Sequence, residues 1–434
     1  MSARGTAAVL LAVGVILTVL AARNPGVVFV DVIAFSARAM ALTEGRRSMD
    51  GLYPVGYPLV LMVGKMIVGD VLIVAKGVSV LAGVGAVACG IAVTMQRHAT
   101  AMAGGIVSAW VLSQPGVLQW GTTEGTDLPA AALSLAAIIL ASQRPALAGA
   151  LAGAACLCRY TAVAAVPIVL VLARDRRALF TLALTTSPHF LGAAIAGISP
   201  LPRQEENIVI ANGSPAALLS METMRRWPVG FARAVATSAR DWATWVGAAG
   251  LLVGVVRRDK VAFGLVGFAM AHAALLGVAF SNPRLVLPGT LALVLGAAWL
   301  TSWRVGSGAV AAATIASFVS HAPAAFAIDK AAAGRALVAA ELPAGPWLAT
   351  SPWLYEQRDG WVIPTIQLSG LGLRRDARAA EIHTAAEREG ASGVVLEGSA
   401  IRRDYPALAS FYEKGEDGFV VVVRRSGYRA YAVR

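Results

Sequence analysis

Long runs of apolar residues dominate the first 330 residues of the chain, with short polar clusters between them. A run of about 17 to 25 apolar residues is long enough for a helix to cross a hydrocarbon core of roughly 30 Å. The pattern therefore predicts an α-helical polytopic membrane protein with about eleven spanning helices. Their expected positions are residues 5–22, 70–95, 101–119, 128–142, 146–158, 160–173, 178–198, 241–256, 261–280, 285–301 and 306–328.

Two stretches depart from this simple spanning pattern. Arg159 and Tyr160 interrupt the apolar residues 146–173, which favours two short helices that meet at a polar turn over one long helix. Residues 56–69 are apolar but too few to span, so they predict an interfacial or re-entrant helix.

Residues 329–434 have a different character, because they hold 27 of the 62 charged residues of the chain. Residues 393–396 and 418–423 form short apolar segments, which we interpret with the period of two typical of strands. We expect two domains: a membrane domain, 1–328, and a small C-terminal α/β domain, 329–434.

Composition excludes a single water-facing globule. The chain is 57% hydrophobic and only 14% charged, whereas a soluble domain is about 25% charged. Its net charge of +12 is concentrated in the membrane part, because residues 329–434 hold 14 of the 37 basic and 13 of the 25 acidic residues. The basic residues stand mostly in short clusters between apolar runs, which indicates topological anchoring and no nucleic-acid partner.

The basic clusters predict the topology. Arg97 with His98, Arg144, residues 174–177, residues 257–260 and Arg304 all fall on the side of the amino terminus, which is then cytoplasmic. The long loops 23–69 and 199–240 and the C-terminal domain are expected on the opposite, extracytoplasmic side of a multi-pass inner-membrane protein. Only one basic residue, Arg4, precedes the first helix, and no clear small-residue cleavage site comes after it. We therefore interpret this helix as a retained span and not as a removed signal peptide.

The three cysteines, Cys89, Cys156 and Cys158, lie inside apolar segments. They suggest neither a disulfide framework nor a metal-ligand spacing.

On this topology, ten of the 12 acidic residues of the membrane part fall on the outer side, and only Asp175 and Asp259 fall inside. Asp31 follows the apolar residues 27–30 and precedes residues with helical spacing, so it suits a helix cap or a general base. Glu124 and Asp127 occupy a short outer turn, TTEGTDLP, where the same two roles are open.

Four segments resemble a known family: 31–45 (DVIAFSARAMALTEG), 53–59 (YPVGYPL), 158–162 (CRYTA) and 282–288 (NPRLVLP). Their order and spacing are similar to those of the polyprenyl-phosphate-sugar-dependent glycosyltransferases of the C-type (GT-C) fold. That family includes protein O-mannosyltransferases and aminoarabinose transferases of lipid A. The chain departs from the family pattern at Phe35, Val55 and Leu285, where tyrosine, proline and an aromatic residue are common.

The resemblance implies transfer of a sugar from a polyprenyl-phosphate donor to a lipid, glycan or protein acceptor on the outer face, with inversion of configuration. Asp31 is the expected general base, and Asp127 and Glu124 are further catalytic candidates. The donor phosphate is expected to bind Lys65, Arg159 and Arg284, although Lys65 and Arg159 also suit snorkelling to the membrane surface. Tyr53, Tyr57 and Tyr160 are expected to line the cavity, which residues 56–69 would roof. The identities of the sugar and of the acceptor, and a role for a divalent metal, stay open.

Two other function classes fit parts of the sequence. A transporter or lipid flippase also suits many helices and a positive cavity, but it is expected to have inverted halves with charges near the midplane. A membrane scaffold with an outer binding domain explains residues 329–434 but leaves the crowded first loop without a role.

Overall fold

The structure is a computed structural model that forms two compact units, Met1–Ala21 with Phe35–Ala327 and Ala22–Ala34 with Ile328–Arg434. The residues that it describes are 2–23, 35–36, 39, 42, 54–98, 100–123, 125–196, 221–278, 285–326, 337–338, 340–343, 345–350, 357–358, 361–362, 365–367, 376–425 and 427–433.

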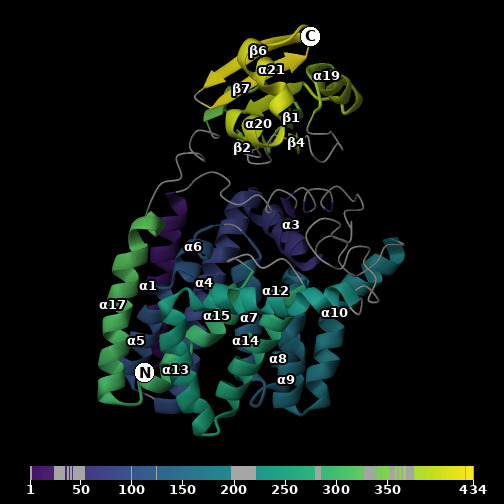
Figure 1. The fold of residues 1–434 in the computed structure, drawn as a ribbon. Coiled ribbons are helices and arrows are strands. Elements are labelled where there is room, and N and C mark those ends of the chain that lie inside the picture. The colour runs from purple at the N-terminus through teal and green to yellow at the C-terminus, as the bar shows by residue number, and fades with distance from the viewer. Residues whose placement is uncertain are drawn as a thin grey trace. The chain divides into compact units, whose positions relative to one another are not determined.

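The first unit is helical (Figure 1). Helix α7 packs between α4 and α8, α10 packs on α8, and α14 packs on α9, α12 and α15. Its described helices are α1 (Ala3–Ala22), α3 (Gly56–Val68), α4 (Val71–His98), α5 (Ala101–Leu112), α6 (Pro115–Trp120), α7 (Asp127–Leu140), α8 (Pro145–Cys158), the 3-10 helix η1 (Tyr160–Ala164), α9 (Ala165–Ala173), α10 (Arg176–Ala196), α12 (Met221–Ala239), α13 (Trp242–Val256), α14 (Lys260–Val278), α15 (Leu287–Val294), α16 (Ala297–Leu300) and α17 (Arg304–Phe326).

Within the described residues, each apolar stretch predicted to span is mainly helical, but two of them are broken. Residues 101–119 divide into α5 and α6, where the side chains of Ser113 and Gln114 donate to the carbonyl of Trp110 at 2.8 and 2.7 Å and Pro115 begins the next helix. Residues 285–301 divide into α15 and α16. Residues 56–69 form the short helix α3, as their length predicted.

Four helices in the described part of the chain are long and apolar enough to cross a membrane: Ala3–Ala22, Val71–Arg97, Arg176–Ile195 and Lys260–Gly277. Seven further apolar helical segments in the described part are shorter, at 10–17 residues. Large apolar side chains such as Leu11, Val171 and Leu252 are exposed to 71%, 66% and 64%. Such a surface is stable only against lipid, so the protein is an integral membrane protein.

Glycines bring helices of the first unit into close contact. A Cβ atom at Gly250 of α13 would lie 1.9 Å from the carbonyl oxygen of Gly296, and one at Gly247 would lie 2.1 Å from that of Leu293. A Cβ atom at Gly149 of α8 would likewise lie 2.0 Å from the carbonyl oxygen of Ala178 in α10. Small residues at helix contacts are typical of membrane bundles, because dispersion forces and not water drive the packing there.

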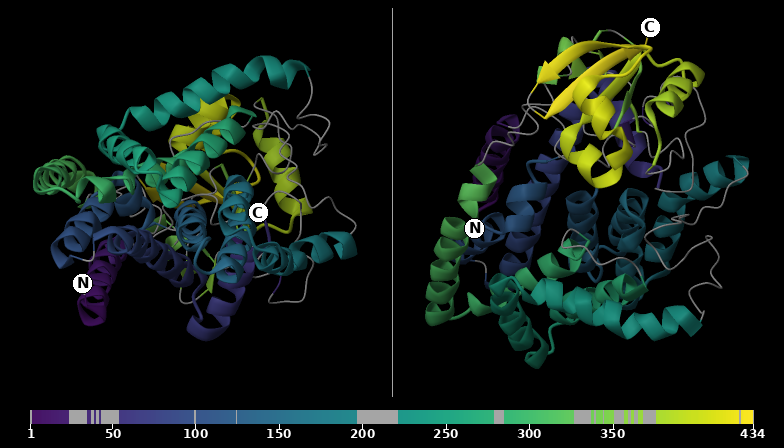
Figure 2. Two further views of the ribbon diagram at one scale, coloured as in Figure 1. Left: turned by 90° about the horizontal axis from the view of Figure 1, so that it is seen from below. Right: turned by 45° about the horizontal axis from the view of Figure 1, so that its top comes forward.

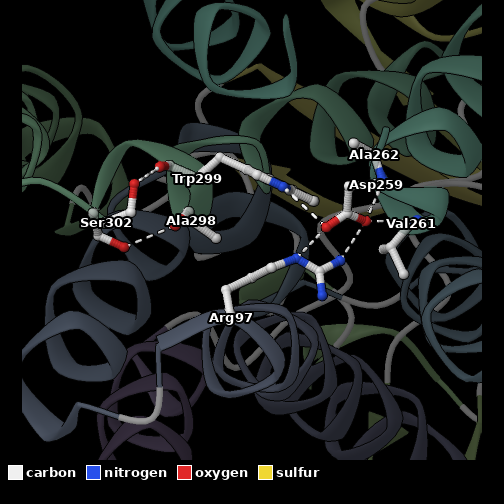
Figure 3. A network of polar contacts seen from close by, with 8 residues as sticks. Arg97, Asp259, Val261, Ala262, Ala298, Trp299 and Ser302 are labelled. Atoms are coloured by element: carbon white, nitrogen blue, oxygen red, sulfur yellow. Dashed lines mark hydrogen bonds and ion pairs between the residues drawn. The ribbon is translucent and has the colours of Figure 1, made fainter. Parts of the chain in front are cut away.

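A polar network joins three helix ends at one end of this unit (Figure 3). The guanidinium of Arg97 binds Asp259 through two contacts of 2.5 Å, and Trp299 Nε1 donates to the same carboxylate at 3.3 Å. Asp259 also accepts from the amide of Val261 at 2.9 Å and so caps α14. Arg97 and residues 257–260, predicted on one side of the membrane, are therefore neighbours in the fold.

The second unit has a five-stranded sheet in the order β4-β1-β5-β7-β6. Strands β4 (Thr365–Gln367), β1 (Trp347–Ala349) and β5 (Gly393–Glu397) are parallel, whereas β7 (Tyr428–Val433) is antiparallel to β5 and to β6 (Phe419–Arg425). Strands β2 (Gln357–Arg358) and β3 (Trp361–Val362) pair separately, and the helices are α19 (Ala379–Arg388), α20 (Gly398–Asp404), η4 (Pro406–Leu408) and α21 (Ala409–Lys414).

Strands β5 and β6 stand where the short apolar segments predicted strands. Buried side chains from β5, β7, α19 and α21 form a core that includes Ile382, Val394 and Phe411. Burial raises the pKa of the Tyr431 phenol above its ordinary value, so the hydroxyl stays neutral and donates to the carbonyl of Tyr412 at 3.1 Å.

Candidate functional site

Arg159 stands at a break between two helices. Helix α8 ends at Cys158, Arg159 has extended backbone with φ −156° and ψ 130°, and η1 begins at Tyr160. This is the polar turn predicted from the sequence, and it presents a guanidinium inside an otherwise apolar region. Burying such a charge is costly unless another group compensates it.

Asp127 supplies that compensation. Its Oδ1 lies 2.7 Å from Arg159 Nη1, and the two side chains are only 2% and 15% exposed. The same Nη1 donates to Thr126 Oγ1 at 3.1 Å. Asp127 also lies in the first turn of α7, where the helix dipole favours a negative charge. The carboxylate is therefore held by the fold and turned toward the arginine.

The first-loop motif reaches this ion pair through α3. Gly56 at the start of α3 lies against Leu157, since a Cβ atom there would come within 2.5 Å of the Leu157 side chain. Tyr57 is fully buried and meets Phe35 edge to face, with 5.1 Å between ring centroids. Phe35 is helical and buried, as the spacing of segment 31–45 predicted. Contacts thus link described residues of segments 31–45 and 53–59 to Leu157, two residues before Arg159.

Two histidines that sequence reasoning missed lie beside the same turn. Tyr160 Oη is 3.4 Å from His189 Nε2, and the His189 side chain is buried. His272 is 1% exposed, and its Nε2 lies 2.8 Å from the carbonyl oxygen of Leu285. The imidazole of His272 also interacts electrostatically with the charge of Arg159. Each histidine is an ionisable residue inside an apolar helix. This pattern in the sequence could have marked both histidines as candidate site residues.

An apolar cavity of about 180 Å³ adjoins His272. It lies between α12, α13, α14 and α15, and Ser238 and Thr244 supply its other polar side chains. Most of its wall consists of aliphatic carbon, from residues such as Val266, Leu276 and Leu293. An aliphatic lining of this kind suits a hydrocarbon chain.

Lys65 lies half-buried in the last turn of α3, and no ion pair joins it to any residue that the structure describes. The remaining predicted site residues, Asp31, Glu124, Arg284 and Tyr53, lie outside the described residues. Within those residues, no group of three or more His, Cys, Asp or Glu side chains is placed to hold a metal ion.

The site combines a buried, ion-paired guanidinium, the contact of helix α3 with the end of α8, and an apolar cavity that adjoins His272. Only Nη1 of the Arg159 guanidinium contacts Asp127 and Thr126 in the described residues. The other N–H groups of this guanidinium can therefore donate to a phosphate oxygen. The apolar cavity suits the chain of a lipid. These features fit a site for a lipid that carries a phosphate.

The helical arrangement matches a known fold: the chain has the fold of ArnT. Two crystal structures of ArnT from Cupriavidus metallidurans share this fold. The apo structure superposes with a TM-score of 0.65 at 13% identity, over 100% of this chain and 98% of ArnT. The structure bound to undecaprenyl phosphate superposes with a TM-score of 0.61 at 14% identity, over 99% and 98%. No protein-family model and no curated protein matches the sequence.

Proposed function

We propose that the protein is a membrane glycosyltransferase that moves a sugar from a polyprenyl-phosphate donor to an acceptor on the outer face of the membrane. The observation that carries the proposal is the buried Arg159 and Asp127 pair at the end of α8, in a chain with the fold of a protein that binds undecaprenyl phosphate. In the proposed complex, Arg159 binds the donor phosphate and the apolar cavity takes part of the polyprenyl chain.

The proposed chemistry is one inverting displacement. The acceptor oxygen or nitrogen forms a bond to the anomeric carbon as the bond from that carbon to the phosphate oxygen breaks. The electron pair of that bond leaves with polyprenyl phosphate, whose charge Arg159 stabilises. Asp31 removes the acceptor proton.

Asp31 is favoured as the base by its place in the chain. It precedes Phe35 by four residues, and Phe35 contacts Tyr57 at the start of α3. Asp127 is a weaker candidate, because its carboxylate is buried and its charge is committed to Arg159. We therefore assign Asp127 the role of a positioning residue for Arg159.

The test compares Asp31→Asn with the wild-type protein. Asparagine keeps the shape and caps a helix about as well, but it cannot accept the proton. Loss of a general base costs about 10²- to 10⁴-fold in rate. The measurement is transfer of label from a panel of undecaprenyl-phosphate sugars by the purified proteins, with thermal melting compared in parallel.

If Asp31→Asn had the melting temperature and the turnover of the wild-type protein, Asp31 would be a helix cap and not the general base. If the wild-type protein consumed none of the donors, glycosyl transfer would be rejected and transport of a lipid phosphate would be tested instead.

A further inference from the structure

Helix α12 runs transversely to the long helices α4 and α14 of the first unit (Figures 1 and 2). Three of its residues fix its inner face. Trp227 Nε1 donates to the carbonyl of Ala274 at 2.9 Å, and Ala234 is 1% exposed. Gly230 lies so close to α14 that a Cβ atom would be 2.2 Å from the carbonyl oxygen of Gly277. The other faces of α12 are exposed.

One exposed flank of α12 is basic. Arg226, Arg233 and Arg240 recur every seven residues and therefore form a nearly straight line along the helix. Arg225 lies beside this line, and all four side chains are exposed. We call these four residues the arginine line.

The opposite exposed flank is apolar. Met224, Pro228 and Val235 stand four and seven residues apart and so share one side of the helix. Met224 and Val235 are exposed to 60% and 41%. Trp245 adds an exposed indole whose Nε1 donates to the carbonyl of Ala239 at the end of α12, at 2.9 Å. Tryptophans are enriched where membranes meet water.

Among the side chains that the structure describes, no carboxylate forms an ion pair with Arg225, Arg233 or Arg240. An anion from outside the described residues would complement these three charges. A helix with one basic flank and one apolar flank is typical of segments that lie in the plane of a membrane surface. Phosphate oxygens are strong acceptors for guanidinium groups at that depth.

We propose that α12 is an interfacial helix that docks on anionic phospholipids of the bilayer. Arg225, Arg233 and Arg240 bind their phosphate-bearing headgroups, while Met224 and Pro228 lie among the acyl chains. The partner is the bilayer lipid itself, and the proposal does not depend on the proposed glycosyl transfer.

The first experiment measures lipid preference. The full-length protein is reconstituted in phosphatidylcholine, and its association with spin-labelled phosphatidylglycerol is compared with that of spin-labelled phosphatidylcholine. Each arginine near an anionic surface is worth about a fivefold preference. The triple variant Arg225→Gln, Arg233→Gln, Arg240→Gln should therefore lower the preference by at least about fivefold.

A matched control removes the same charge elsewhere. Arg388→Gln, Arg402→Gln and Arg424→Gln change three exposed arginines of the second unit. This control should keep the wild-type preference. The proposal is overturned if the control loses as much preference as the α12 variant, or if the α12 variant loses none.

The second experiment measures the orientation of α12. Nitroxide labels are placed at Met224→Cys on the apolar flank and at Val229→Cys, which lies between Arg225 and Arg233. The background lacks the native cysteines and must melt like the native protein. The label at 224 should be relaxed mainly by oxygen and the label at 229 mainly by a water-soluble nickel chelate. Equal accessibility of the two labels, or the reverse order, would contradict an interfacial helix.

Discussion

At the scale of single residues, the partner of Arg159 decides what this arginine can do. A lone arginine between apolar helices would turn toward the membrane surface. Asp127 and Thr126 instead hold Nη1 at 2.7 and 3.1 Å, so the guanidinium has a fixed orientation. A fixed guanidinium loses less entropy when it binds a phosphate than a mobile one does.

We predict that Arg159→Ala raises the apparent KM for the polyprenyl-phosphate donor far more than Arg159→Lys does. Lysine keeps the positive charge but cannot bind Asp127 and a phosphate through one planar group. Steady-state kinetics with a varied donor provide the measurement. Similar KM values in all three proteins would leave Arg159 without a role in donor binding.

The same kinetics separate two roles for Asp127. If Asp127 positions Arg159, Asp127→Asn should raise the donor KM in the wild-type background and change little in the Arg159→Ala background. A base would behave differently, because its loss would lower kcat by about 10²- to 10⁴-fold in both backgrounds.

At the scale of elements, glycine contacts set the distance between helices. In α13, Gly247 and Gly250 lie one turn apart and face the backbone of the α15 and α16 segment. The indole of Trp110 from α5 donates to the carbonyl of Val294 in the same segment at 3.0 Å. The break between α15 and α16 therefore lies where two other helices approach it closely.

We predict that Gly250→Ala destabilises the protein by about 1 to 3 kcal/mol, because the added methyl group forces α13 away from Gly296. Gly77→Ala in α4 is the control, since a Cβ atom there has no neighbour within 4 Å. The control should be neutral or stabilising, as alanine is the better helix former. Melting in detergent measures both variants, and an equal loss for both would refute the packing argument.

At the scale of the whole molecule, the distribution of arginines predicts a cytoplasmic amino terminus and residues 329–434 outside. The contacts of Arg97 with Asp259 agree with this prediction in one respect, since both residues were assigned to the same side. A reporter that is active only in the cytoplasm, fused after Arg434, should give no signal. A strong signal would mean that the number of spans is even, and it would move the proposed site to another compartment.

Much of the fold follows from local properties of the sequence. Apolar run length predicted the helices, the polar residues Arg159 and Tyr160 predicted the break after α8, and the short apolar segments 393–396 and 418–423 predicted β5 and β6. These features depend on hydrophobicity and backbone preference over a few neighbouring residues, which a single sequence records directly. Helix α12 was not predicted, because it contains no long apolar run. Its apolar and basic residues instead recur at helical spacing, and run length does not detect that pattern.

The tertiary structure decided which residues meet. The sequence marked Asp127 and Arg159 as costly charges, but 32 positions separate them, and only the packing of α7 against α8 brings them within 2.7 Å. The same packing turned Asp127 from a catalytic candidate into a proposed partner of Arg159. The packing of α10 on α8 and of α14 on η1 also placed His189 and His272 beside the site. Run length determines where a helix forms, whereas contacts between distant helices determine which of its side chains share a site.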